Sequence, residues 1–278
     1  MKKVVWLASY PKSGNTWMRT FLWAFQNKGP LNLNRMNTGG IFSSKSVIEN
    51  SLDLNSDFLY QHEIEEFQTT AHDYVFENLT KPRFVKIHDA YIFSRWTSKP
   101  IVPLKSNHLV IYIVRNPLDV TPSFANHSST DNASIIEKQI NNPEGALVKI
   151  KPRATTQFHQ LMGSWSMHVN SWLDQTVAPV HLVRYEDMSA DPFNTFKEIL
   201  EKIGLEYTDE QILATIKRTD FKEIKKLEEE QGFREKPNPD NSFFQTGKVG
   251  RWKDELTQEQ IQSICTIHEQ TMKKLDYL

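Results

Sequence analysis

The sequence SYPKSGNTW, Ser9–Trp17, decides the fold of this chain. It follows the apolar run KVVWLA, which is typical of a buried strand, and it precedes MRTFLWAF, which has the pattern of a helix. A strand, a tight polar turn and a helix together form the usual layout of a phosphate-binding loop. In such a turn the backbone N–H groups converge on one anion, and the helix adds the positive end of its dipole. The sequence therefore predicts an anion site at residues 9–17.

The residue types within the loop support this prediction. Lys12 adds a full positive charge, Gly14 permits the bend, and Ser13, Asn15 and Thr16 add side-chain donors. The nucleotide P-loop has the pattern G-x-x-x-x-G-K-[ST], in which the hydroxyl binds magnesium. Here the Lys precedes the Gly, and no Ser or Thr follows a Gly-Lys pair. The loop therefore predicts an anion site of a different kind from the magnesium-nucleotide site.

The length and composition of the chain restrict the class of protein to which it can belong. The chain has 278 residues, 38% hydrophobic and 24% charged, which predicts one domain over residues 1–278 with a sizeable core. Its formal net charge of -1 argues against a nucleic-acid partner. The single Cys265 excludes an internal disulfide and favours a reducing compartment. We expect neither a signal peptide nor a membrane-spanning segment, and we expect a cytoplasmic location.

Four short apolar runs predict buried parallel strands at residues 4–8, 84–88, 109–114 and 180–185. Helical patterns lie between them, so we predict an α/β fold with a central parallel sheet flanked by helices. Asp191-Pro192 predicts a helix start and Gly204 its end. Thr208 and Thr257 have capping-box spacing to a Gln three residues later. Polar segments at 28–46, 126–157 and 228–250 are predicted as loops.

The loop YPKSGNTW resembles the 5′-phosphosulfate-binding loop of the cytosolic-type sulfotransferases. These enzymes use the sulfate donor 3′-phosphoadenosine 5′-phosphosulfate (PAPS) and release 3′-phosphoadenosine 5′-phosphate (PAP). The family usually has Thr in place of Asn15. By this resemblance Lys12, Ser13, Gly14, Asn15 and Thr16 bind the donor, and Trp17 stacks on its adenine.

Three further segments resemble family motifs in the same order. VRNPLDVTPSF resembles the 3′-phosphate motif, which implies that Arg115 and Ser123 grip the 3′-phosphate. VRYEDM implies that Tyr185 approaches the adenine. RTDFKEIKK implies that Thr219 and Phe221 flank the adenine.

TGKVGRWKDEL is similar to the family's R-K-G-x-x-G-D-W-K, which closes over the 3′-phosphate, so Gly247 and Lys248 are expected to bind the donor. The chain departs from this pattern, because Gln245 and Thr246 replace the Arg-Lys pair. Lys248 or Arg251 is the candidate substitute. The family's dimerisation motif is only partly present in KDELTQEQIQ, so the oligomeric state stays open.

FVKIHDAY resembles the family's K-T-H motif, in which the His is the catalytic base. The resemblance implies that His88 takes the acceptor's proton, that Lys86 neutralises the transferring group, and that Lys12 neutralises the leaving phosphate oxygen. No metal is needed, and the sequence has no Cys/His cluster. A small-molecule acceptor is expected, with a hydroxyl or an amino group as the nucleophile, and Asp89 beside the base makes a cationic acceptor worth testing.

Two other functions stay open at this point. The first is a P-loop-like nucleotide kinase or NTPase, which would depend on magnesium. The second is a non-catalytic module that binds PAPS or PAP, suggested by the loss of the Arg-Lys pair at Gln245 and Thr246.

Overall fold

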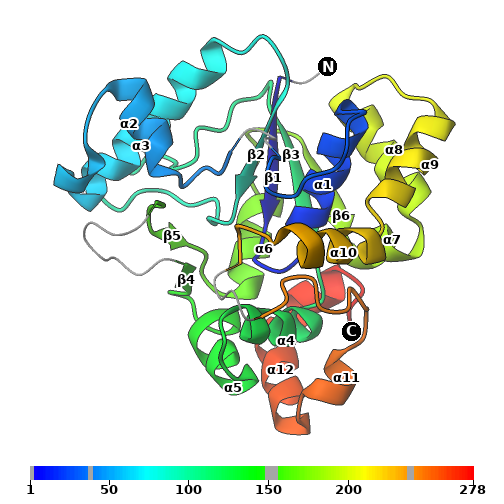
Figure 1. Ribbon diagram of the computed structural model, residues 1–278. Helices are drawn as coiled ribbons and strands as arrows, with labels where there is room; N and C mark the ends of the chain where they lie inside the picture. Colours follow the sequence, from blue (N-terminus) through cyan, green and yellow to red (C-terminus); the bar gives the residue numbers. More distant parts are fainter. Residues whose placement is uncertain (1–2, 37–39, 148–155, 237–240) are drawn as a thin grey trace.

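The computed structural model describes residues 3–36, 40–147, 156–236 and 241–278. In these ranges a parallel sheet of four strands forms the centre, in the order β2-β1-β3-β6 (Figure 1). The strands are β1 (Val4–Ser9), β2 (Arg83–Ile87), β3 (Leu109–Val114) and β6 (Val180–Arg184). The predicted α/β fold is confirmed. The second and fourth strands end one residue earlier than predicted, so His88 and Tyr185 stand just beyond the sheet.

Alternate residues of the two central strands enter two different hydrophobic cores. Trp6 of β1 and Tyr112 of β3 belong to one core, whereas Leu7 and Ile111 belong to the other. All four side chains are fully buried. Since both faces are covered, every position of these strands is apolar or small, which explains why they appear in the sequence as continuous apolar runs.

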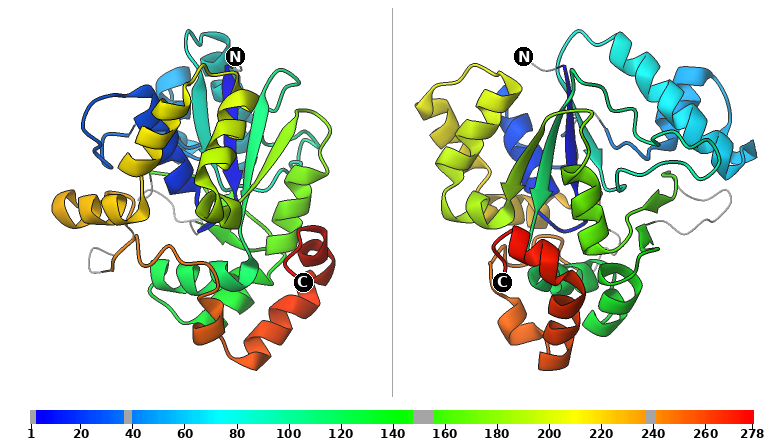
Figure 2. Two further views of the ribbon diagram at one scale, coloured as in Figure 1. Left: turned by 90° about the vertical axis from the view of Figure 1, so that its right-hand side faces the viewer. Right: turned by 180° about the vertical axis from the view of Figure 1, so that it is seen from behind.

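Helices cover the two faces of the sheet (Figures 1 and 2). The core that contains Leu7 includes side chains of α1 (Asn15–Gln26), α7 (Tyr185–Ala190), α8 (Pro192–Ile203) and α9 (Asp209–Arg218). The core that contains Trp6 includes side chains of α3 (Gln61–Glu77), α4 (Pro117–His127), α6 (Trp165–Leu173) and α12 (Gln258–Lys274). Both layers are therefore built from segments far apart in the chain.

Local signals mark the helix ends as predicted. The Asp191 side chain accepts from the backbone N–H of Asn194 at the start of α8, and Gly204 ends α8 with φ of 80°. Thr208 and Thr257 form complete capping boxes at α9 and α12. Each of these signals depends on a few neighbouring residues only, so it can be identified without the tertiary structure.

The three predicted loops contain more regular structure than expected. Segment 126–157 includes the end of α4, α5 (Asn132–Ile135), a π-helical turn η2 (Ile136–Ile140) and β4 (Ala146–Leu147), which pairs with β5 (Gln160–Leu161). α2 (Lys45–Leu52) begins within 28–46, and α10 (Phe221–Gln231) extends into 228–250. Two short helices complete the description, η1 (Ser56–Phe58) and α11 (Trp252–Glu255). The loop prediction for residues 37–39, 148–155 and 237–240 lies outside the described residues.

The strand order determines where a ligand can bind. The chain passes from β1 to β2 on one side, and then returns past β1 to β3 on the other side. Loops after neighbouring strands therefore diverge at the carboxyl end of β1, which is where open α/β sheets bind ligands. The loop 9–17, His88, Arg115 and Tyr185 all follow these strand ends. None of the helices formed by the described residues combines the length and the apolar character that crossing a membrane requires.

Candidate active site

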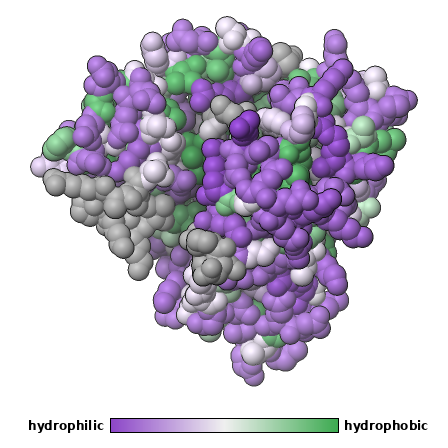
Figure 3. All heavy atoms as spheres, viewed as in Figure 1, coloured by the Kyte–Doolittle hydropathy of each residue, from purple (hydrophilic) through white to green (hydrophobic). Residues whose placement is uncertain are grey.

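A cavity of about 1100 Å³ opens at this edge of the sheet. On the face shown in Figure 3, hydrophobic residues are visible in a hollow between mostly hydrophilic flanks. The cavity brings together twelve of the residues predicted from the sequence, namely Lys12, Gly14, Asn15, Thr16, Trp17, Lys86, His88, Arg115, Ser123, Tyr185, Phe221 and Gly247. Ser13, Thr219 and Lys248 are predicted site residues that do not line the cavity.

The loop has the strained, donor-rich geometry expected of an anion cradle. Gly14 has φ of 105° and Lys12 has φ of 68°, so two of its residues lie in the left-handed region. The Ser13 hydroxyl is buried, and it has no hydrogen-bond partner in the described structure. A buried donor without a partner costs free energy, which a bound anion would recover. Ser13 does not line the cavity, so its role as a phosphate ligand stays a prediction.

Asn15 differs from its predicted role. Its side-chain amide donates to the Leu7 carbonyl at 2.8 Å and to Ser9 Oγ at 3.1 Å. The side chain thus ties the loop to β1 and has no amide hydrogen aimed at a phosphate. Its backbone N–H, at the start of α1, keeps the orientation that favours an anion.

Lys12 is a cation without a carboxylate partner among the ion pairs of the described chain. Its Nζ lies 3.9 Å from the centre of the Phe243 ring. Burial, together with Lys86 and Arg115 nearby, lowers the pKa of Lys12 to about 7. A nearby phosphate would restore the charge, so the state of Lys12 depends on what the cavity holds.

Arg115, just beyond β3, links the cradle to the C-terminal segment, residues 241–252, through the carbonyls of Lys12 and Lys248. Its guanidinium lies 4.2 Å from the centre of the Tyr185 ring, and it donates to the Lys248 carbonyl at 2.9 Å. Arg115 Nε is buried and has no hydrogen-bond partner in the structure as described. The expected donor contact of Lys248 differs from what the structure shows, because its side chain is exposed and does not line the cavity, and its backbone carbonyl accepts from Arg115.

Aromatic rings form the wall beside Arg115. Trp17 contacts Tyr185 edge to face at 5.9 Å between ring centres, and the Tyr185 hydroxyl donates to the Gly247 carbonyl at 2.8 Å. Phe221 packs so closely on Gly247 that a Cβ there would lie 2.5 Å from the ring. Thr219 is fully buried behind this wall, where its hydroxyl donates to the Thr215 carbonyl.

His88 is held in one tautomer. Its Nδ1 lies 2.7 Å from the Ser9 carbonyl oxygen, which can only accept, so Nδ1 carries the proton and Nε2 has a free lone pair. Burial, and next to it the charge of Lys86, holds the pKa of His88 well below its ordinary value. The imidazole is therefore neutral at pH 7 and able to accept a proton at Nε2.

A buried network fixes the backbone of His88. Tyr112 donates its hydroxyl proton to His168 Nδ1 at 2.7 Å, and His168 Nε2 donates to the His88 carbonyl at 3.1 Å. One residue further, the Trp172 indole donates to the Asp89 carbonyl at 3.0 Å. These contacts tie the two residues after β2 to α6.

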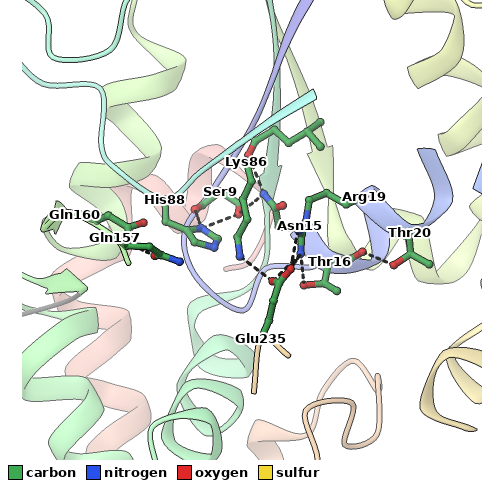
Figure 4. A network of polar contacts seen from close by, with 11 residues as sticks. Ser9, Asn15, Thr16, Arg19, Thr20, Lys86, His88, Gln157, Gln160 and Glu235 are labelled. Carbon is green, nitrogen blue, oxygen red and sulfur yellow. Dashed lines mark hydrogen bonds and ion pairs between the residues drawn. The ribbon is translucent and has the colours of Figure 1, made fainter. Parts of the chain in front are cut away.

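Glu235 enters the cavity from the C-terminal half of the chain and was not predicted. Its carboxylate accepts from both terminal nitrogens of Arg19, at 2.8 to 2.9 Å, and from Lys86 Nζ at 3.1 Å (Figure 4). The two cations hold the pKa of Glu235 far below its ordinary value. Arg19, which follows the loop by two residues, was also missed. No sequence signal joins it to a residue 216 positions away.

Comparison with known proteins agrees with this arrangement. The sequence profile described as "Sulfotransferase domain" matches residues 2–276. The chain belongs to the sulfotransferase family. The resemblance seen in YPKSGNTW and in the later motifs is thereby confirmed over nearly the whole chain.

Curated relatives of this sulfotransferase are distant but cover most of its length. "Cytosolic sulfotransferase 17" of Arabidopsis thaliana is 22% identical over 98% of this chain and 75% of its own. "Sulfotransferase 1E1" of Bos taurus is 24% identical over 96% of this chain and 82% of its own length. "Flavonol 3-sulfotransferase" of Flaveria bidentis is 24% identical over 94% of this chain and 78% of its own length.

Solved structures share the fold of this sulfotransferase. Mouse sulfotransferase SULT7A1 complexed with PAP superposes with a TM-score of 0.62 at 20% identity, covering 100% of this chain and 86% of that one. Retinol dehydratase in complex with androsterone and inactive cofactor PAP gives 0.60 at 18% identity, with coverage of 98% and 81%.

The C-terminal segment of the sulfotransferase is fastened over the cavity without the missing Arg-Lys pair. Asp119 of α4 accepts from the backbone N–H groups of Gly250 and Trp252 at 2.7 and 3.2 Å. Arg251 lines the cavity, but its guanidinium donates to the Glu255 carboxylate and to the side-chain oxygen Oε1 of Gln245. Of the two candidate substitutes, Arg251 is therefore placed at the cavity and Lys248 is not.

The cavity lining also includes apolar and uncharged polar side chains, among them Met36, Ile41, Leu147, Gln157 and Gln160.

Asp89, suggested from the sequence as a partner for a cationic acceptor, is not among the described residues that line the cavity. Burial raises the pKa of Asp89 to about 8, so it is mostly protonated at neutral pH. Within the described residues of this sulfotransferase, no cluster of three or more His, Cys, Asp or Glu side chains could hold a metal ion.

Proposed function

We propose that this sulfotransferase moves a sulfuryl group from PAPS to a hydroxyl or amino group of a small-molecule acceptor and releases PAP. The observation that carries the proposal is the convergence of the cradle, Lys86, His88 and Arg115 on one cavity. Transfer of a sulfuryl group resembles transfer of a phosphoryl group, so positioning and charge stabilisation supply most of the rate enhancement.

The cavity suits a donor with several negative charges. The cationic side chains among its described lining residues are Lys12, Arg19, Lys86, Arg115, Arg234 and Arg251, against the single carboxylate of Glu235. The unpaired Ser13 hydroxyl and Arg115 Nε supply donors at the two places where the resemblance expects the 5′- and 3′-phosphates. That two proteins of the same fold were crystallised with PAP supports the same ligand here.

The proposed chemistry assigns a role to each group near the reacting atoms. His88 Nε2 accepts the acceptor's proton as the new bond to sulfur forms. Lys86 neutralises the sulfuryl oxygens, and Lys12 neutralises the phosphate oxygen released when the donor's S–O bond breaks. Because Nδ1 is committed to Ser9, proton transfer to Nε2 leaves the ring in place.

The acceptor is proposed to be a small molecule with limited positive charge. The lone carboxylate among the described lining residues is bound to two cations when no donor is present, so the ligand-free cavity offers little to an ammonium group. Apolar side chains with the carboxamides of Gln157 and Gln160 suit a neutral hydroxylated compound. The single cysteine, together with a curated relative named as cytosolic, supports a cytoplasmic place of action.

Calorimetric titration with PAP in the absence of metal, beside ATP with magnesium, tests the donor. We expect micromolar binding of PAP and feeble binding of ATP. Binding of ATP with no response to PAP would overturn the proposal in favour of a nucleotide kinase or NTPase.

Turnover is then followed with PAPS labelled in the sulfuryl group and a panel of phenols, alcohols, sugars and amines. Transfer of label to any member supports an enzyme. Tight PAP binding without transfer to the whole panel would support a non-catalytic PAPS-binding or PAP-binding module.

A further inference from the structure

Glu235 holds an unusual position, because the other charged side chains among the described lining residues of the cavity are all cationic. Figure 4 shows its side chain reaching from the segment after α10 toward the gap between α1 and the end of β2. Arg19 grips it with two nitrogens and Lys86 with one. A fork-like guanidinium with an ammonium beside it is a general binding site for oxyanions.

Arg19 and Lys86 both need a nearby anion to balance their charges. The Arg19 side chain is 9% exposed and the Lys86 side chain 15%, and a buried cation without a partner is costly. The Glu235 side chain is 25% exposed, so it has access to solvent. Of the three side chains Glu235 is therefore the one that a competing anion from solvent would displace, and Arg19 and Lys86 would then need that anion as their partner.

The position of Arg19 favours the sulfuryl group as that anion. Arg19 Nη2 lies 3.4 Å from Thr16 Oγ1, so the guanidinium borders the cradle that would hold the adjoining phosphate. Lys86, which shares Glu235 with Arg19, is the residue proposed to neutralise the sulfuryl oxygens. The charges of Lys86 and Arg19 both act on the imidazole of His88 and lower its pKa. The carboxylate thus sits among the phosphate cradle, the proposed sulfuryl ligand and the proposed base.

We propose that Arg19 binds the sulfuryl oxygens of the donor beside Lys86, and that Glu235 holds their place when the donor is absent. This inference rests on the proposed function. Donor binding then exchanges one anion for another. Glu235 competes with the donor, and its departure frees Arg19 and Lys86 at the moment when the sulfuryl group arrives.

The test compares PAPS with PAP, which differ by the sulfuryl group. The variants are Arg19→Met, Arg19→Lys and Glu235→Gln, with Glu230→Gln in the preceding helix α10 as a control. Among the described residues, Glu230 forms an ion pair with Lys226 alone, on the exposed surface of α10. Affinities are measured by calorimetry without acceptor, and thermal unfolding is followed without ligand.

We expect Arg19→Met to weaken PAPS binding roughly tenfold or more and PAP binding much less, because a charged hydrogen bond to the sulfuryl group is lost. Arg19→Lys should recover part of the loss. Glu235→Gln should tighten PAPS binding roughly tenfold, and it should lower the ligand-free melting temperature because two buried cations lose their partner. Glu230→Gln should match the wild-type chain.

Each alternative result is informative. Equal loss of PAP and PAPS affinity in Arg19→Met, or no loss, would overturn the role of Arg19. Weaker or unchanged PAPS binding in Glu235→Gln would show that Glu235 supports the site and does not compete for it. If Arg19→Met fails to fold, the double variant Arg19→Met/Glu235→Gln removes both charges and gives the same comparison. A wild-type chain that binds neither PAP nor PAPS would overturn the proposed function itself.

Discussion

The charge of Lys12 provides a quantitative test of the cradle. Without ligand, burial and the neighbouring cations lower the pKa of Lys12 to about 7, while Glu228 and Glu235 act weakly in the opposite direction. A bound phosphate favours the charged form and raises this pKa. Binding of PAP above pH 7 is therefore expected to take up a proton, and PAP affinity should fall as the pH rises.

The size of the effect follows from the charged fraction of Lys12. With a pKa of about 7, roughly half of the ligand-free protein is charged at pH 7 and about 3% at pH 8.5. If only the charged form binds PAP well, the affinity falls about fifteenfold over this interval, which is about 1.6 kcal/mol. The interval lies above the second pKa of a phosphate monoester, about 6, so PAP contributes little change of its own.

Calorimetry at constant ionic strength, in buffers with different ionisation enthalpies, measures both the affinity and the proton uptake. Lys12→Arg keeps a charge at every pH and should flatten the profile, whereas Lys12→Met should bind weakly at every pH. A flat profile for the wild-type chain between pH 7 and 8.5, or an unchanged slope in Lys12→Met, would refute the reasoning.

Three further predictions concern the base, the loop and the scaffold. His88→Ala should reduce turnover roughly 10²- to 10⁴-fold with PAP affinity retained, and full activity of this variant would contradict the assignment. Gly14→Ala should lower the free energy of unfolding by about 2 kcal/mol in urea titration, because φ is 105° and the new Cβ would lie 2.7 Å from the Tyr185 ring. Gly29→Ala, which meets no atom within 4 Å, is its control and should be nearly neutral. Asp191→Ala should cost about 1 kcal/mol of stability through loss of the α8 cap and leave turnover unchanged, and a loss of turnover in the folded variant would argue against a purely structural role.

Much of the fold could be predicted because its signals are local. The strands at Val4–Ser9 and Leu109–Val114 are apolar at every position, since helices cover both faces of the sheet. The caps of α8, α9 and α12 depend on residues three positions apart. The anion loop was equally visible, because its strand, turn and helix are consecutive in the chain.

Predictions of side-chain roles were less complete, because a sequence motif does not specify the direction in which each side chain points. The amide of Asn15 is used inside the loop, the buried Thr219 hydroxyl donates to the Thr215 carbonyl, and the Lys248 side chain is exposed away from the cavity. Whether the polar atom of a side chain reaches the cavity depends on the packing of neighbouring segments, which no local pattern encodes.

The sequence by itself determined the parallel sheet, the cradle after the first strand, and the placement of His88 and Arg115 at strand ends, because each follows from neighbouring residues. Only the tertiary structure decided the charge balance of the site. Arg19 and Lys86 are separated from Glu235 by 216 and 149 positions. Their contact exists because the segment after α10 folds back over the sheet edge, where buried cations and a carboxylate neutralise one another.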